Sequence, residues 1–172
     1  MGVAKIEELW YDDTNGEKGG NTTEIRFVSA RSQDFRALAA KLDAYYFTLV
    51  GDIQLQYAEP NRPENMSALV VAYDGKVPIA CGAWKAIDDS TAEIKRIFVE
   101  PQYRRKGVAR AVIQTLEDHA AFTGHSKLIL ETAVDTTGSH RLYLSLGYQI
   151  RQYYGSPAGA DNCLCFEKES TL

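Results

Sequence analysis

The chain has 172 residues, a formal net charge of −4, and 45% hydrophobic against 24% charged residues. This length suits one domain, and the composition excludes a disordered, collagen-like or coiled-coil chain. The acidic balance is a poor match to nucleic acid or an anionic membrane, and no apolar run approaches the ~20 residues of a membrane span. The first residues lack the apolar core of a secretory signal. The three cysteines, Cys81, Cys163 and Cys165, show no metal-ligand spacing. We therefore expect a reduced, cytoplasmic protein without a metal.

The first third of the chain predicts an arm, a strand and a helix. Residues 12–23 are polar and glycine-rich, so residues 1–23 are interpreted as a loosely attached polar N-terminal arm and residues 24–172 as the domain. Residues 24–30 alternate in the manner of a strand, and Ser32 can cap a following helix with apolar residues at helical spacing. Residues 45–66 are interrupted by glycine and proline, which predicts a short helix and a long loop.

The remaining elements predict the fold class. Strands are expected at residues 68–73 and 77–86, joined by an Asp74-Gly75 hairpin turn, and at 92–99. An apolar stripe from Val108 to Ala120 predicts a helix that ends near Gly124, and residues 127–132 predict a strand. The strand–helix–strand segment that results is typical of a right-handed crossover to a parallel neighbouring strand. A helix at 138–146 and strands at 148–154 and 163–168 follow. The order predicts a single α/β (α+β) domain, with a mixed, mostly antiparallel sheet of six or seven strands and helices on both faces.

Basic residues gather at the start of the helix that is predicted after the strand at residues 92–99. Arg104, Arg105, Lys106 and Arg110 lie within seven positions, although the positive end of a helix dipole disfavours each cation by about 0.3–1 kcal/mol. An anion would resolve this conflict, because the free N–H groups of a first helical turn bind phosphate and Gly107 lets the backbone approach it. The alternative is a solvated basic helix start. The pattern is neither a Walker loop nor a Rossmann fingerprint.

The segment Arg104-Arg105-Lys106-Gly107-Val108-Ala109 fits the Arg/Gln-x-x-Gly-x-Gly/Ala signature of the GCN5-related N-acetyltransferase (GNAT) superfamily. A strand at residues 93–99 precedes it, and Leu142-Tyr143 and Gly147-Tyr148 follow in the order that the superfamily shows. The chain resembles this superfamily over residues 24–168. The resemblance implies acetyl-CoA as cosubstrate and no metal, with the pyrophosphate on the backbone of residues 104–109 and the pantetheine arm along Ile97–Val99. The expected cosubstrate-binding residues are Ile97, Phe98, Val99, Arg104, Arg105, Lys106, Gly107, Val108, Ala109, Arg110, Thr136 and His140.

Two of these positions carry an alternative. Members of the superfamily often have Asn where this chain has Thr136, so one contact to the pantetheine arm is altered or missing. His140 lies one helical turn before Tyr143 and could line the cosubstrate mouth, or it is an exposed helix residue. His119 and His125 are expected on the surface, and Cys163 and Cys165 are expected in core packing.

Transfer of an acetyl group from a thioester to an amine needs a base for the amine and an acid for the leaving thiolate. The resemblance places Tyr143 as the acid, and a phenol with a pKa of about 10 is protonated at neutral pH. It places Glu93 as the base, with Glu131 or a water chain as the fallback. The alternatives are that Tyr143 packs its helix and that Glu93 pairs with a lysine of the sheet. Main-chain N–H groups near Phe98 would polarise the thioester carbonyl.

The acceptor pocket is expected to involve Tyr46, Tyr57 and Glu131. The aromatic and amide side chains of residues 45–66 favour a small polar amine or amino acid over a basic protein tail. The predicted function is direct acetyl transfer from acetyl-CoA to such an amine, with no nucleic-acid or membrane partner; a homodimer is left open. The alternative classes are a non-catalytic acyl-CoA-binding regulatory domain and, disfavoured by charge, a nucleic-acid-binding module.

Overall fold

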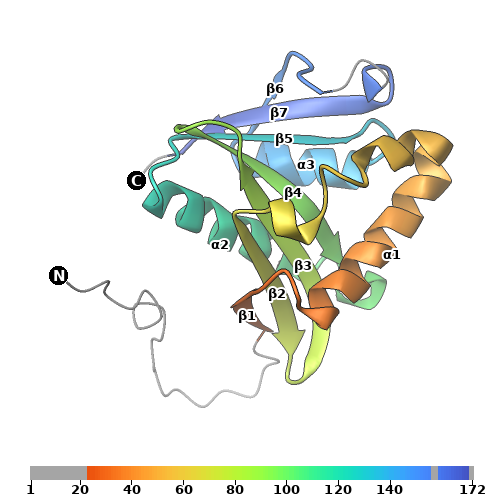
Figure 1. The fold of residues 1–172 in the computed structure, drawn as a ribbon, viewed down its shortest axis with the longest axis vertical. Helices are drawn as coiled ribbons and strands as arrows, with labels where there is room; N and C mark the ends of the chain where they lie inside the picture. The colour runs from red at the N-terminus through yellow and green to blue at the C-terminus, as the bar shows by residue number, and fades with distance from the viewer. Residues whose placement is uncertain (1–22, 156–158, 171–172) are drawn as a thin grey trace.

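The computed structural model describes residues 23–155 and 159–170, which form seven strands and three α-helices (Figure 1). The predicted arm therefore lies outside the described residues, apart from Thr23, which begins the first strand. The strands are β1 (Thr23–Val28), β2 (Ala68–Asp74), β3 (Val77–Ala86), β4 (Thr91–Val99), β5 (Lys127–Ala133), β6 (Gln149–Arg151) and β7 (Cys163–Glu169). The helices are α1 (Gln33–Val50), α2 (Val108–Phe122) and α3 (Thr137–Ser145), with short 3-10 helices η2 (Gly51–Tyr57), η3 (Pro63–Asn65) and η4 (Pro101–Tyr103).

All seven strands form one sheet in the order β1-β2-β3-β4-β5-β7-β6. Every neighbouring pair is antiparallel except β4 and β5, which are parallel and are connected through α2, as the crossover pattern predicted. This parallel pairing covers only Thr91–Glu93 of β4 against residues 127–129 of β5. Beyond Glu93 the two strands pair no further over their described lengths, so the middle of the sheet opens towards the carboxyl ends of both strands.

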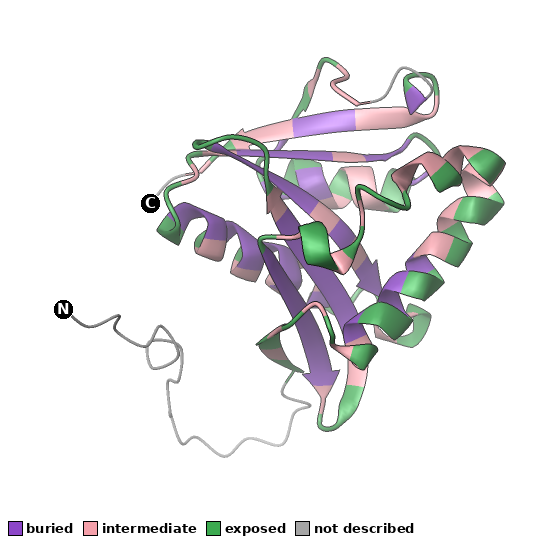
Figure 2. Cartoon of the chain, viewed as in Figure 1, coloured by how far each residue is buried: buried purple, intermediate pink, exposed green. Residues whose placement is uncertain are grey.

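Each face of the sheet has its own apolar core, as the alternation of side chains in β2 requires. Val70 and Ala72 pack with α2 and α3, whereas Leu69 and Val71 pack with α1. Figure 2 shows the buried residues concentrated in the central strands and on the sheet-facing side of the helices. Helices on both faces and a mixed, mostly antiparallel sheet confirm the predicted fold class.

Three boundaries differ from the prediction. The helix capped by Ser32, whose Oγ accepts the Phe35 N–H at 3.2 Å, continues to Val50, and the segment expected to be a long loop contains η2 and η3. The Leu42 side chain is buried against the sheet and holds the later turns of α1 in place. The strand expected at 148–154 is only Gln149–Arg151, because Tyr153 and Tyr154 turn their hydroxyls towards the sheet. Over the described residues, no helix is long and apolar enough to cross a membrane.

Candidate functional site

A large cavity of about 560 Å³ occupies the opening between β4 and β5. Its walls come from α1, the end of β4, the turn before α2, the start of α2 and the start of α3. Of the residues predicted to bind the cosubstrate, those that line it are Ile97, Phe98, Val99, Arg104, Arg105, Gly107, Val108, Ala109, Arg110 and Thr136. Lys106 and His140 are absent from the lining. Nine residues of one motif and one strand, together with Thr136 at the start of α3, thus meet around one cavity.

The start of α2 offers main-chain donors to this cavity. Gly107 has a φ of 83°, and no atom lies within 4 Å of the position that a Cβ would take there. The first intrahelical bond runs from the Ala111 N–H to the Gly107 carbonyl at 3.1 Å, so the N–H groups of Val108, Ala109 and Arg110 precede the helical hydrogen-bond ladder. Such a helix N-terminus binds phosphate oxygens. The geometry fits the pyrophosphate of a coenzyme A.

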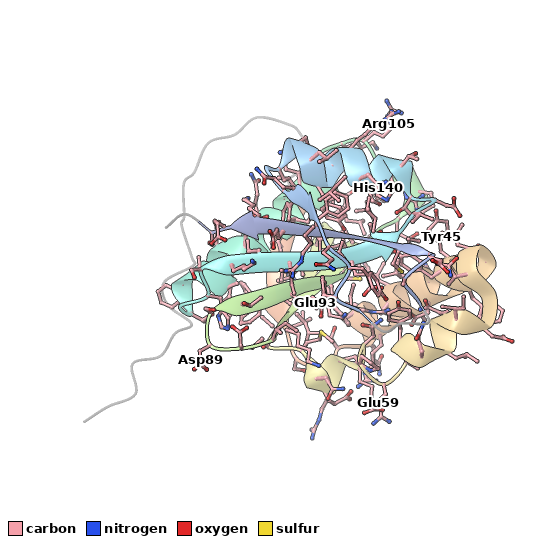
Figure 3. All side chains as sticks on the ribbon, turned by 90° about the horizontal axis from the view of Figure 1, so that it is seen from above. Tyr45, Glu59, Asp89, Glu93, Arg105 and His140 are labelled. Carbon is pink, nitrogen blue, oxygen red and sulfur yellow. The ribbon has the colours of Figure 1, made fainter. Side chains whose placement is uncertain are left out.

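The basic side chains of the motif have different positions. Arg104 donates from Nε to the Val99 carbonyl at 2.9 Å, which ties it to the end of β4 and leaves its other donors for a ligand. Arg110 donates to Ser145 Oγ at 2.7 Å and so joins α2 to α3. Lys106 lies over the Tyr103 ring at 5.3 Å. Figure 3 shows Arg105 reaching outward from the surface, and the residue also lines the large cavity.

Tyr143, the predicted acid, lines the large cavity from α3. Its ring is buried and packs against Tyr148 and Phe166, with centroid distances of 5.8 and 5.6 Å. Among the described residues, no hydrogen bond engages its hydroxyl. Burial, with a smaller contribution from the neighbouring Tyr46 phenol, raises the pKa of Tyr143 well above its usual value. The phenol is therefore protonated at neutral pH, as an acid must be.

The start of α3 is held by a chain of polar contacts. Thr136 is buried and its Oγ donates to the Ala133 carbonyl at 2.7 Å and lies 3.0 Å from Thr132 Oγ1. His140 Nε2 lies 2.9 Å from the same carbonyl. Because a carbonyl only accepts, this nitrogen carries the proton. His140 therefore fastens α3 to the end of β5, which accounts for its absence from the cavity wall.

A small cavity of about 80 Å³ lies beside the large one, and Leu42 and Tyr46 line both. All three predicted acceptor residues, Tyr46, Tyr57 and Glu131, line it. Tyr57 donates its hydroxyl to Glu131 Oε1 at 2.6 Å, and Tyr153 donates to the same oxygen at 3.4 Å. Burial and this contact with Glu131 raise the pKa of the Tyr57 phenol strongly.

The charged side chains at the small cavity differ in whether they have an ion-pair partner among the described residues. Lys95 pairs with Glu93 at 3.1 Å and Arg96 pairs with Asp43 at 2.6 Å. No lysine, arginine or histidine of the described residues forms an ion pair with Glu131. Glu131 is thus a half-buried carboxylate held by phenols, beside a cavity and without a cation.

Glu93, the predicted base, is placed differently. Its side chain is buried, accepts the Tyr154 hydroxyl at 3.0 Å and pairs with Lys95, and it lines neither cavity. Figure 3 shows Glu93 among the strands. The lysine pairing that the sequence left open as the alternative is thus present. Its cause is the alternation of β4, which places Glu93 and Lys95, two residues apart, on the same face of the strand.

The cysteine and histidine side chains outside the motif contact other protein groups. Cys165 is buried in the core, whereas Cys163 lines the small cavity, 3.6 Å from the Tyr57 hydroxyl. Burial and the adjacent Glu131 raise the pKa of the Cys163 thiol to about 12, so it is not a thiolate at neutral pH. His119 accepts the Trp84 Nε1–H at 3.1 Å, and His125 packs on the same Trp84 ring. The described residues contain no group of three or more metal-ligating side chains.

Two charged residues of the site were not predicted. Lys95 and Arg96 both line the small cavity. Arg96 could have been suspected, because the alternation of the strand places it in line with Ile94 and Phe98, where a core residue is expected. Lys95 gave no such signal.

Comparison with known proteins agrees with this geometry. The model of the acetyltransferase (GNAT) family matches residues 26–148, so the chain belongs to this family. A Klebsiella pneumoniae crystal structure superposes with a TM-score of 0.74 at 23% identity, covering 88% of this chain and all of that one. The GNAT family acetyltransferase of Elizabethkingia anophelis, solved with acetyl-CoA bound, gives a TM-score of 0.66 at 18% identity, covering 87% of this chain and 99% of that one.

Curated relatives match part of their own length. The N-acetylaspartate synthetase of Danio rerio is 28% identical over 114 residues, which is 66% of this chain and 39% of that protein. The IAA acetyltransferase of Azospirillum brasilense is 38% identical over 95 residues, which is 54% of this chain and 60% of that protein. This chain therefore covers less than two thirds of the length of either relative.

Proposed function

We propose that this protein transfers the acetyl group of acetyl-CoA directly to the primary amine of a small polar molecule, with an amino acid as the favoured acceptor class. The observation that carries the proposal is Glu131, a carboxylate that pairs with no cation among the described residues and lines a small cavity that shares Leu42 and Tyr46 with the large one. An acceptor that arrives as an ammonium ion would supply the missing cation, and the Tyr46 and Tyr57 rings beside it suit a cation as well.

The large cavity is the proposed cosubstrate site. Acetyl-CoA supplies an activated acetyl thioester when bound. The N–H groups of Val108, Ala109 and Arg110 would hold its pyrophosphate, and the remaining donors of Arg104 would add charge-assisted contacts. The main chain of Ile97–Val99, which β5 leaves unpaired, would take the pantetheine arm in the manner of an added strand.

The chain's own side chains supply the proton transfers. Glu131 would hold the acceptor ammonium and take its proton, directly or through a water molecule, which leaves the amine lone pair free to attack. Tyr143 would return a proton to the departing sulfur. Glu93, predicted as the base, is the less favoured carboxylate, because Lys95 and Tyr154 engage it away from both cavities.

The acceptor class follows from the size and charge of the small cavity. A cavity of about 80 Å³ suits a small molecule better than a polypeptide tail. Its lining carries the carboxylate of Glu131 and, from Lys95, an ammonium shared with Glu93; together these would complement the ammonium and carboxylate of an amino acid. The name of the N-acetylaspartate synthetases also points to an amino-acid acceptor in those relatives.

A panel of amines and amino acids with acetyl-CoA, followed by release of the free thiol, tests the proposal. For the best acceptor, Glu131→Gln should lower kcat/KM by about 10²–10⁴-fold, since it removes both the ammonium contact and the base. Glu59→Gln, which changes an exposed carboxylate of the same charge, is the matched control and should keep full activity. Coenzyme A binding without turnover of any amine would support the alternative, a non-catalytic acyl-CoA-binding domain.

A further inference from the structure

Arg96 of β4 has a backbone conformation that only a few non-glycine residues adopt. Its φ is 60°. Cys81 of β3 pairs with Phe98 while Ala83 pairs with Lys95, so two residues of β4 face Gly82 alone. This is a β-bulge, which turns a strand and re-aims the residues that follow it. The residues that follow are Ile97–Val99, whose main chain borders the large cavity.

The side chain of Arg96 is clamped to α1. Its two terminal nitrogens donate to the two carboxylate oxygens of Asp43 at 2.6 and 2.8 Å, and Nη2 also donates to the Ala39 carbonyl at 2.9 Å. The side chain is only 5% exposed. Lysine could not reproduce this contact, because the planar fork of arginine matches a carboxylate with two parallel bonds.

The contacts around Arg96 connect a wall of the small cavity to the part of β4 that borders the large one. The Cys81 thiol donates to the Arg96 carbonyl at 3.4 Å, which holds the bulge from the β3 side. Gln54 of η2 donates to Asp43 Oδ1 at 3.0 Å, and Gln54 lines the small cavity together with Arg96. Asp43 thus joins a wall of the small cavity to the strand segment that borders the large one.

We infer that Arg96 is a positioning residue for acetyl transfer, and that Asp43 is the anchor through which it acts. The guanidinium fixes the left-handed turn of β4 at the bulge. The bulge in this way sets the direction of the main-chain N–H groups of Ile97–Val99 that face the large cavity, and those groups would polarise the thioester carbonyl. Because Asp43 also holds Gln54, the Arg96–Asp43 pair positions both a wall of the proposed acceptor cavity and the strand segment beside the proposed cosubstrate cavity. This inference rests on the proposed function.

An ion pair between a buried arginine and a half-exposed carboxylate can also be a purely structural contact, so the test must separate the two roles. Arg96→Gly removes the guanidinium while glycine still permits the positive φ of the bulge. Asp43→Asn keeps the shape of the anchor and removes its charge. Arg36→Ala is the control, because Arg36 also joins a backbone carbonyl, that of Ala30 at 2.9 Å, to a carboxylate, that of Glu64, away from the bulge.

The first measurement is amide hydrogen exchange of the ligand-free proteins. We expect faster exchange at Ile97–Val99 in Arg96→Gly and Asp43→Asn than in the wild type, with β1 and β2 unchanged and with no change at Ile97–Val99 in Arg36→Ala. This readout does not depend on turnover, so it stands even if the wild type acetylates no amine and the proposed function fails.

The second measurement is kinetic. A misplacement of about 1 Å at a reacting group can cost about 10²-fold, so Arg96→Gly should lose kcat on this scale while KM for acetyl-CoA changes little. Added guanidinium at millimolar concentration should restore part of the lost kcat in Arg96→Gly and none in Asp43→Asn. Wild-type exchange at Ile97–Val99 in both variants, or a kcat loss that follows thermal stability alone and resists rescue, would overturn the inference. If Arg96→Gly does not fold, the exchange and kcat of Asp43→Asn decide it.

Discussion

Replacing Tyr143 with phenylalanine removes one oxygen atom from the wall of the large cavity and leaves the ring in place. The Tyr143 ring keeps its contacts with Tyr148 and Phe166 at 5.8 and 5.6 Å, and no protein hydrogen bond is lost among the described residues. The free energy of unfolding should therefore change by less than about 1 kcal/mol, the usual net contribution of one hydrogen bond. A large effect on activity could not then be attributed to misfolding.

The expected effect on catalysis is much larger. Loss of a general acid lowers kcat by about 10²–10⁴-fold, or about 3–5 kcal/mol in the barrier. KM for acetyl-CoA should change little, because the phenol would act on the sulfur as negative charge develops there. Since burial raises the pKa of Tyr143 above 10, the wild-type pH–rate profile should show no loss from this group between pH 6 and 9.

The assay is thiol release under steady-state conditions, with thermal unfolding of the same samples. Tyr148→Phe is the matched control, because Tyr148 packs against Tyr143 but lines neither cavity. It should retain kcat. Full turnover by Tyr143→Phe would refute the reasoning, since it would mean that water protonates the thiolate and that Tyr143 only packs.

Three further predictions concern binding and stability. Arg104→Ala should weaken coenzyme A binding by about 1.5–3 kcal/mol, and Gly107→Val should weaken it too by disfavouring a φ of 83°; unchanged calorimetric affinity in both would contradict the cosubstrate site. Burial lowers the pKa of His119, so the unfolded chain binds the proton more readily and the free energy of unfolding should fall as pH drops below about 6.5. In urea titrations, His119→Gln should reduce this pH dependence of the free energy of unfolding, and an unchanged pH dependence would contradict the prediction. Gly82→Ala should lower stability by about 1–3 kcal/mol through overpacking, because its Cβ would lie 2.7–2.9 Å from Val112, Ile97 and Leu116; an unchanged melting temperature would show that these side chains give way.

The sequence carries the local features of the fold and of the phosphate-binding turn. The Asp74-Gly75 turn is a two-residue signal, and Gly75 adopts the positive φ of 60° that such a turn needs. The residues 104–110 motif predicts a site because its cations conflict with the helix dipole, and that conflict is local as well.

The remaining features depend on contacts that no local pattern contains. Tyr57 meets Glu131 across 74 positions of the chain. Glu93 and Glu131 are glutamates of neighbouring strands, and the sequence does not distinguish them. The structure shows that Lys95 pairs with Glu93. The bulge at Arg96 is equally hidden, because arginine does not signal a positive φ.

The short parallel pairing of β4 with β5 has a consequence for the order in which the chain folds. Strands β2, β3 and β4 follow one another through short turns, so this part of the sheet forms from contacts between nearby segments, whereas β1 pairs with β2 across 41 to 51 positions of the chain. The other half, with β5, β7 and β6, meets it at three residue pairs that lie 36 positions apart along the chain, from Thr91 with Lys127 to Glu93 with Ile129. Because closing such a loop costs entropy before any pair forms, contacts of this kind are made late. The opening at the proposed reaction site is therefore expected to form only after strands β2, β3 and β4 have paired.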